Sequence, residues 1–109
     1  MAEDAAVSRE AFWGAVELLA HPIRREILEA LLSGGPASIS DLTRTIGKPW
    51  TTIAYHLDIL EQDTLLRPSY EKVAHSWGHV YRVETARLEV LYGTVKRGIK
   101  AGLLQAPRK

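Results

Sequence analysis

The sequence predicts one mainly α-helical domain with a small β-hairpin near its C-terminal end. The chain has 109 residues, which is the size of one ordinary domain and too short for two cores, so a single domain is expected over residues 1–109. Hydrophobic residues recur at helical spacing in four stretches, whereas residues 65–84 lose this spacing and favour extended chain. The hydrophobic share of 46% and the charged share of 25% argue against a disordered chain, a fibre or a membrane protein.

The first two helices are expected at residues 8–20 and from Pro22 to about residue 32. Ser8 can cap the first helix, and Pro22 suits the first position of the second because its missing N–H would have no partner there. The sequence Ser-Gly-Gly-Pro at residues 33–36 ends the second helix.

The middle of the chain predicts a short strand and two further helices. Residues 37–39 are expected to form the strand, and Ser40 caps a short helix at 41–46 that ends at Gly47. A longer amphipathic helix follows over residues 49–62. Its inward side is expected to carry Trp50, Ile53, Leu57 and Leu60.

The last third predicts a hairpin and a final helix. Residues 65–84 form the hairpin, with a turn near Ser76-Trp77-Gly78. Residues 85–103 form the helix, which Gly93, Gly98 and Gly102 weaken by roughly 1 kcal/mol each. One side of this helix is expected to carry Leu88, Leu91, Tyr92, Val95 and Ile99.

Charge and composition exclude several classes of site. The net charge is +1, residues 40–84 sum to −1, and the C-terminal bases are Lys96, Arg97, Lys100, Arg108 and Lys109. The chain has no cysteine, which excludes disulfides, thiolate metal sites and cysteine nucleophiles. No apolar run is long enough to cross a bilayer, and the acidic N-terminus does not resemble a secretory signal, so a cytoplasmic protein is expected.

This order of elements is that of a winged helix-turn-helix domain. Residues 18–32, LLAHPIRREILEALL, resemble the opening motif of the ArsR-type transcription regulators of bacteria and archaea. Residues 39–42, ISDL, and 53–61, IAYHLDILE, resemble the family's helix before the turn and its recognition helix. Residues 78–83, GHVYRV, are similar to its final wing strand. The resemblance covers about residues 12–84 and implies a DNA-binding regulator.

The helix at 49–62 is the expected recognition helix, because a helix fits the major groove of B-DNA. Thr51, Thr52 and Tyr55 are expected to face DNA, although the threonines could instead cap the helix and Tyr55 could be a plain exposed aromatic. For His56, packing and DNA contact are left open with equal weight. The bases expected to neutralise phosphates are Arg44 and Lys48.

The hairpin at 65–84 is the expected wing. Its tip carries Lys72, His75, Trp77 and His79, which by resemblance would contact the minor groove or the flanking phosphates. Trp77 could insert against DNA or fold back onto apolar surface, and both alternatives stay open. His75 and His79 have no third ligand nearby and are expected to face solvent rather than hold a metal ion.

The resemblance also implies a homodimer formed through the first and last helices. The residues expected at this interface are Phe12, Val16, Leu19, Leu88, Leu91, Tyr92, Val95 and Ile99. The alternative is that both hydrophobic stripes pack within one chain. The metal-sensing sites of many relatives need cysteines, or carboxylate and histidine pairs on the last helix, and the last helix has Glu89 but no histidine. No metal and no cofactor are therefore expected, and a small-molecule effector remains open.

Three function classes follow. A sequence-specific DNA-binding regulator is favoured by the order of motifs and the hydroxyl groups of the expected recognition helix. A winged-helix module for protein contacts is the alternative, because the −1 balance of residues 40–84 does not favour phosphate binding. An enzyme is disfavoured, because no carboxylate pair, phosphate loop or activated nucleophile is evident.

Overall fold

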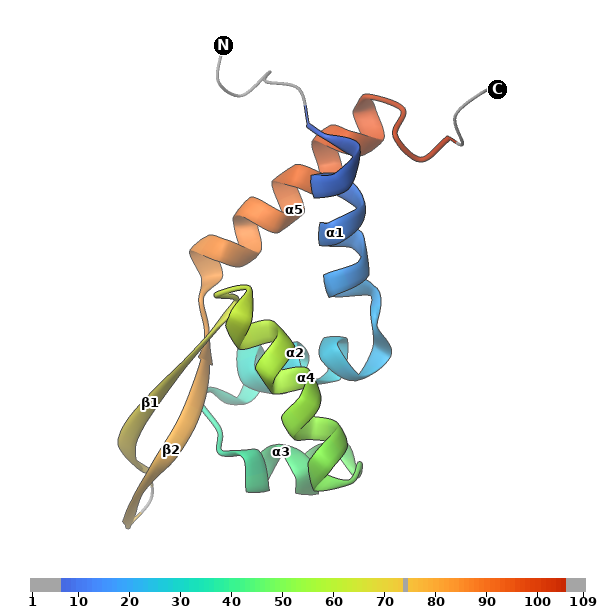
Figure 1. Cartoon of the computed structure of the whole chain (residues 1–109). Helices are drawn as coiled ribbons and strands as arrows, with labels where there is room; N and C mark the ends of the chain where they lie inside the picture. The colour runs from blue at the N-terminus through green and yellow to red at the C-terminus, as the bar shows by residue number, and fades with distance from the viewer. Residues whose placement is uncertain (1–6, 74, 106–109) are drawn as a thin grey trace.

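The computed structural model describes residues 7–73 and 75–105, and the C-terminal bases Arg108 and Lys109 lie outside the described residues. The described residues form five helices and two strands in the expected order (Figure 1). These are α1 (Arg9–Ala20), α2 (Pro22–Gly34), α3 (Ile39–Ile46), α4 (Trp50–Gln62), β1 (Leu66–Val73), β2 (Ser76–Val83) and α5 (Thr85–Lys100).

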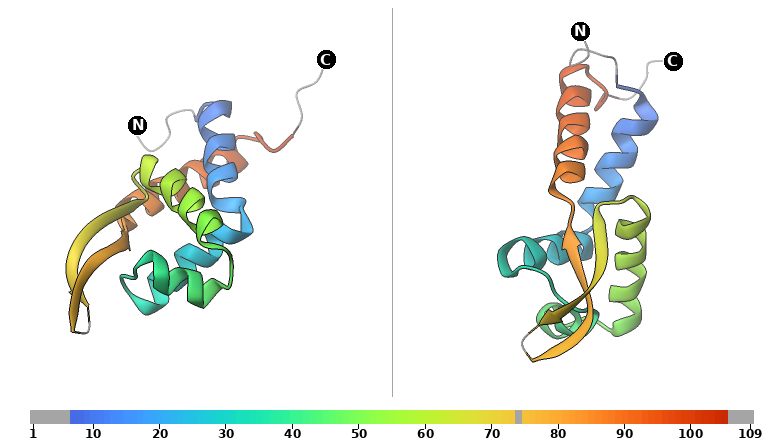
Figure 2. Two further views of the ribbon diagram at one scale, coloured as in Figure 1. Left: turned by 60° about the horizontal axis from the view of Figure 1, so that its bottom comes forward. Right: turned by 90° about the vertical axis from the view of Figure 1, so that its left-hand side faces the viewer.

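The molecule is elongated because α1 and α5 project together from one end (Figures 1 and 2). The other helices form the body, and the β-hairpin extends from its side. The principal extents are 57 × 30 × 21 Å and the radius of gyration is 16.2 Å. A compact domain of this length would have a radius of gyration of about 13 Å. The projecting helix pair therefore exposes much more surface than a sphere would.

The core lies where α2, α3 and α4 meet the base of the hairpin, and Ala15 of α1 and Leu91 of α5 extend it. Its residues are Ala15, Ile27, Leu28, Leu31, Leu42, Ile53, Leu57, Leu60, Leu65, Leu66 and Leu91. The prediction for Trp50 was wrong, since its side chain is 57% exposed. Trp50 is the first residue of α4, one turn before the buried Ile53. It lies beyond the end of the core, so its ring remains exposed.

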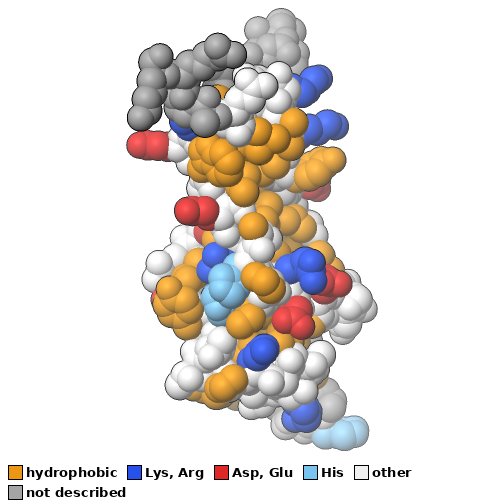
Figure 3. Space-filling model, turned by 90° about the vertical axis from the view of Figure 1, so that its right-hand side faces the viewer, with side chains coloured by type: hydrophobic (Ala, Val, Ile, Leu, Met, Phe, Trp, Pro, Cys, Tyr) orange, Lys and Arg blue, Asp and Glu red, His pale blue; other side chains and the backbone are white. Residues whose placement is uncertain are grey.

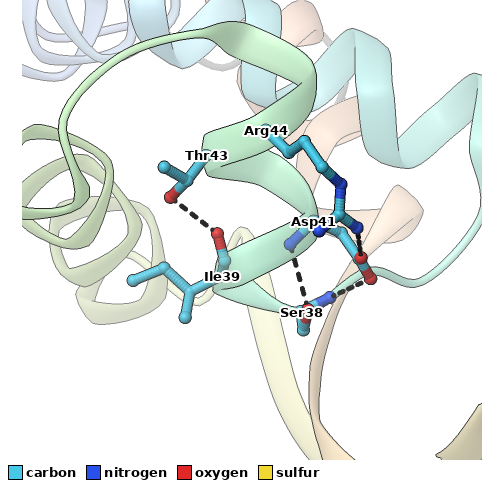
Figure 4. A network of polar contacts seen from close by, with 5 residues as sticks. All are labelled: Ser38, Ile39, Asp41, Thr43 and Arg44. Atoms are coloured by element: carbon cyan, nitrogen blue, oxygen red, sulfur yellow. Dashed lines mark hydrogen bonds and ion pairs between the residues drawn. The ribbon is translucent and has the colours of Figure 1, made fainter.

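Residues 37–39 form a single bridge rather than a strand, because α3 begins sooner than predicted. The Ser38 side chain accepts from the Asp41 N–H, and the Asp41 carboxylate accepts from the Ser38 N–H (Figure 4). This capping box starts the helix at Ile39, so the cap is Ser38 and not Ser40. Ala37 alone pairs with Tyr81, through backbone bonds of 3.4 and 2.9 Å.

The hairpin turn also comes earlier than predicted. β1 and β2 are antiparallel, and the pairing runs from Leu66 opposite Val83 to Val73 opposite Ser76. Trp77 therefore lies within β2, opposite Lys72, instead of in the turn. Gly78 does not have the positive φ that would favour a glycine turn.

Helix α5 ends at Lys100, three residues before the predicted end. Gly102 has a φ of +81°, and the N–H groups of Gly102 and Leu103 donate to the carbonyls of Ile99 and Gly98 at 3.0 and 2.9 Å. These bonds form a Schellman motif, which needs the left-handed conformation that glycine adopts without strain. Gly102 therefore defines the end of the helix.

Gly98 brings α5 into close contact with α1. Phe12 of α1 is fully buried, and a Cβ added at Gly98 would lie 2.0 Å from its Cδ1 atom. The prediction that Phe12 lies at an interface between chains was wrong. The ring instead fills the space that Gly98 leaves between the two helices of one chain.

We expect Gly98→Ala to lower the melting temperature, because the methyl group would force α1 and α5 apart. Overpacking of this kind costs about 1–3 kcal/mol, and each kcal/mol lowers the melting temperature of such a domain by about 4–8 °C. Gly93→Ala is the control, since its Cβ would meet only the flexible end of Arg97, 3.2 Å away. Thermal unfolding of both variants tests the contact. A Gly98→Ala protein as stable as Gly93→Ala would contradict it.

Candidate nucleic-acid interface

Three structural elements lie at the end of the molecule opposite to the α1–α5 pair. These are α3, the first turn of α4 and the tip of the hairpin, and Figures 1 and 2 show all three at that end. Gly47 makes the turn between α3 and α4 possible, with a φ of +76° and an N–H that donates to the Thr43 carbonyl at 2.9 Å. This turn presents the N-terminal end of α4 to solvent.

The outward side of α4 carries the predicted hydroxyl groups. The side chains of Thr51 and Tyr55 are exposed, the latter by 64%, and Thr52 is half-buried. The N-cap position is Pro49, and no side chain caps the helix. The alternative that the threonines serve as capping groups is therefore wrong, and their hydroxyls remain available for another partner.

His56 is buried and does not reach the outward side of α4. Its side chain is 5% exposed, and its ring lies 4.3 Å from the ring of His21, measured between centroids. The Nδ1 atom is 3.3 Å from Nη1 of Arg24. Burial, and then the charges of His21 and Arg24, lower the pKa of His56 below its ordinary value of 6.5. Of the two alternatives for His56, the structure favours packing.

Most arginines of the body are paired with carboxylates. Arg44 pairs with Asp41 (Figure 4). Three more arginines form pairs within 3.0 Å: Arg67 with Glu84, Arg82 with Glu71, and Arg87 with Asp63. The hydrogen bonds from Arg82, and then from Ser69, lower the pKa of Glu71 to about 2, so this carboxylate keeps its charge at any physiological pH.

Two lysines at this end of the molecule have no such partner. Within residues 40–84, apart from the undescribed residue 74, no carboxylate lies within 4.0 Å of the Lys48 or Lys72 ammonium group. Lys48 directly precedes α4, and Lys72 is next to the end of β1. Positive charge free for an anionic partner is thus found at the start of α4 and near the tip of the hairpin.

One side of the hairpin forms an aromatic surface. Side chains alternate along a strand, so the observed register places Tyr70, Lys72, Trp77 and His79 on the same side. The rings of Tyr70 and Trp77 stack at 5.7 Å with 18° between their planes, and both residues are about 60% exposed. Trp77 therefore packs on a neighbouring ring while most of its surface stays in solvent.

Tyr70 was missed at the level of sequence, because the turn was predicted at residues 76–78. The signal was present in the alternation of Tyr70 and Lys72, but only the correct register puts Tyr70 opposite His79 and diagonal to Trp77. His75 is also exposed. In the part of the chain that the structure describes, no group of three or more potential metal-ligating side chains occurs.

The α1–α5 pair presents a second surface, and it is hydrophobic. Figure 3 shows hydrophobic side chains gathered over the upper part of one face, where this helix pair lies. Of the predicted interface residues, Tyr92 and Ile99 are exposed, and Leu91 is buried in its own chain like Phe12. The half-buried ones are Val16, Leu19, Leu88 and Val95. Trp13, whose hydrophobic side chain the sequence also places on the first helix, is exposed, and so are Val90 and Leu104, which were not predicted.

No helix among the described residues is both long and apolar enough to cross a membrane.

Comparison with known proteins agrees with this fold. A family model described as a helix-turn-helix domain matches residues 19–68, from the end of α1 into β1. A crystal structure of an ArsR family transcriptional regulator superposes with a TM-score of 0.64 at 22% identity, over 94% of this chain and 100% of that chain. No curated protein matches the sequence. Residues 19–68 are thus similar to a helix-turn-helix domain, and the chain shares the winged helix-turn-helix fold of that crystal structure.

Proposed function

We propose that the protein is a sequence-specific DNA-binding transcriptional regulator that acts as a homodimer. In this proposal α4 enters the major groove, and the hairpin contacts the adjacent backbone or minor groove. The observation that carries it is the pair of exposed hydroxyl-bearing side chains, Thr51 and Tyr55, in the first half of α4, which begins at the same end of the molecule as the hairpin tip. The structural relative that is named a transcriptional regulator supports the proposal.

The contacts divide into base readers and phosphate contacts. Thr51, Thr52 and Tyr55 supply hydroxyl groups that can bond base edges, whereas Lys48 and Lys72 supply uncompensated charge for phosphates. Arg44 reaches a phosphate only if it leaves Asp41 or shares its donors with it. Each phosphate contact contributes about 0.9 to the slope of log affinity against log salt, so a dimer with two free lysines per chain should show a slope of about 4.

The wing contributes a different kind of contact. Its aromatic surface, made by Tyr70, Trp77 and His79, offers apolar area beside Lys72. Aromatic side chains of this kind pack against sugars or base steps in the minor groove. His75 at the tip adds a hydrogen-bonding group close to the flanking backbone.

The exposed part of the α1–α5 pair is the proposed dimer interface. Trp13, Tyr92 and Ile99 expose hydrophobic surface on two helices that already project from the body. Burying this surface against a second copy is favourable, and a two-fold axis there would direct both recognition helices toward half-sites about 34 Å apart. The radius of gyration of 16.2 Å, which is larger than that of a compact domain of this length, supports this arrangement.

A protein-interaction module is the second candidate function. The arginine–carboxylate pairs of Arg44, Arg67, Arg82 and Arg87 favour it, because they neutralise charge that a DNA-binding surface would normally present. The deciding experiment is selection of bound sequences from a pool of random duplex DNA at two salt concentrations. Enrichment of an inverted repeat would support the dimeric regulator, and absence of retention at low salt would favour the interaction module.

Tyr55→Ala and Thr51→Ala should reduce discrimination between the selected duplex and random DNA. One base contact is worth about 1–3 kcal/mol, which corresponds to roughly 5- to 150-fold in the ratio of the two affinities. Gln62→Ala is the matched control, since Gln62 is exposed at the far end of the same helix. Fluorescence anisotropy with both DNAs gives the ratio. An equal reduction in affinity for both would show that these side chains do not read bases.

Lys48→Ala should weaken binding to every sequence and lower the salt slope by about one unit for each lysine that no longer binds a phosphate. Asp41→Asn should do the opposite, because it frees the Arg44 charge while the amide oxygen can still accept from the Ser38 N–H. Lys100→Ala, at the other end of the molecule, is the control. Affinities measured over a salt series test both changes, and an unaltered slope for Lys48→Ala would remove Lys48 from the interface.

Ile99→Asp should produce a folded monomer of 12.1 kDa, because Ile99 is half-exposed in the single chain and the charge would then face the partner. Leu91 is unsuitable for this test, since it is buried and a charge there would unfold the chain. Leu32→Asp, on exposed α2 surface, is the control. Sedimentation equilibrium and circular dichroism report assembly and folding. A dimeric Ile99→Asp protein would place the interface elsewhere.

A further inference from the structure

A single arginine ties the end of α1 to the proposed recognition helix. Arg24 lies in the first turn of α2 and donates to the carbonyls of Glu17 and Leu18, at 3.0 and 2.9 Å, in the last turn of α1. Its remaining nitrogen, Nη1, lies 3.3 Å from Nδ1 of His56 in α4. We call Arg24, His21 and His56 the corner cluster.

The geometry of this contact determines the protonation state of His56. A guanidinium group carries only donors and stays protonated, so Nδ1 of His56 must accept and the ring must be neutral. A protonated ring would instead place an N–H donor against the Arg24 donor. The hydrogen bond between α2 and α4 therefore exists only while His56 lacks its second proton.

His21 makes a second acceptor contact beside His56. Its Nδ1 accepts from the Ile23 N–H at 3.2 Å and thereby caps α2. Its ring contacts that of His56, with 4.3 Å between centroids. Two imidazoles that both serve as Nδ1 acceptors are thus packed together beside a permanent positive charge. A proton on His56 removes its acceptor and adds a positive charge next to Arg24.

The surroundings offer little to compensate for an added charge. A groove next to the corner cluster is lined by Glu17, His21, Arg24 and Tyr55, and Glu17 is the one carboxylate among its lining residues. The Glu17 side chain is exposed, and Tyr55 contacts His56 through an edge-on ring contact of 5.1 Å. Near the other elements that pack against α4, the carboxylates Asp41 and Glu84 are already paired with Arg44 and Arg67.

We propose that the corner cluster makes the attachment of α4 to the α1–α2 corner acid-labile, so that proton binding there releases the recognition helix and lowers the affinity for DNA. The loosening is a property of the fold. The decrease in DNA affinity rests on the proposed function.

The direction of the effect follows from the state of His56. Burial and the neighbouring charges lower the pKa of His56 in the folded protein, so just below pH 6.5 the unfolded chain binds more protons than the folded chain. The cluster therefore contributes its full stability above this pH and loses it as the pH falls. General electrostatics predicts the opposite for DNA binding, because a protein that gains protons carries more positive charge and is attracted more strongly to phosphates.

The first test is thermal unfolding of the full chain between about pH 7.5 and pH 5.5, the range in which an ordinary histidine gains its proton. Asparagine is the informative replacement at both positions, because its side-chain oxygen can accept where Nδ1 does and does not titrate. The melting temperature of the wild type should fall on acidification, and the combined variant H21N/H56N should show a smaller fall. The combined variant H75N/H79N, changed at exposed wing positions, should behave like the wild type. An equal fall in wild type and H21N/H56N would overturn the proposal.

The second test measures binding to the selected duplex over the same range. Wild-type affinity should fall at least about fivefold toward pH 5.5, whereas H21N/H56N should bind equally well or better, because it lacks the acid-labile contact and acidification makes the protein more positive. Wild-type affinity that rises on acidification would overturn the link to DNA. If no duplex binds at any pH while the unfolding result holds, the proposed function fails and the acid-labile corner stands.

A spectroscopic measurement covers variants that do not fold. In nitrogen NMR of the wild-type chain, His56 should show an unprotonated Nδ1 and a protonated Nε2 at neutral pH, and its pKa should lie below the ordinary value of 6.5. A His56 ring that is doubly protonated at neutral pH, or whose pKa is not below 6.5, would overturn the proposal.

Discussion

The guanidinium of Arg24 determines how the projecting helix pair and the body are joined. It bonds the last carbonyls of α1, which have no partner within the helix, and also reaches the buried ring of His56 in α4. Gly98 performs the corresponding task at the far end, where its missing side chain lets α5 close over Phe12. These two contacts fix the position of α1 relative to both α5 and α4. A dimer built on the projecting helices would therefore fix where the recognition helices lie.

In the described part of residues 40–84, Arg44, Arg67 and Arg82 are each paired with a carboxylate, which leaves Lys48 and Lys72 as the unpaired cations of that segment. The Glu71–Arg82 pair lies on one side of the hairpin, and the aromatic rings of Tyr70 and Trp77 lie on the other. The strand alternation thus separates a neutralised side from an apolar side that retains Lys72. Attraction to phosphate from these residues is limited, so under the proposed function the affinity for DNA would depend on shape, on the hydroxyl groups of α4 and on two copies binding together.

The sequence was sufficient where a local rule decides the structure. Ser8, Pro22 and Gly47 mark helix ends that follow from capping and turn chemistry, and the hydrophobic spacing of α4 predicted that Ile53, Leu57 and Leu60 face inward. It failed where two segments distant in sequence decide it. Phe12 has the pattern of an interface residue, and Gly98 has the pattern of a weak helix. Only the packing of one against the other shows that both serve the fold of one chain.

At the candidate site, the register of the hairpin and the burial of His56 are likewise decided by residues distant in sequence. The sequence Ser-Trp-Gly suggests a turn, but the pairing that starts at Leu66 and Val83 fixes the register and carries Trp77 into the strand. His56 lies at the border of two sides of α4, where helical spacing alone does not separate inside from outside. Arg24, 32 positions away in sequence, supplies the hydrogen bond that makes burial of this imidazole tolerable. Since that bond requires the neutral ring, the contact that completes the fold also gives it a dependence on pH.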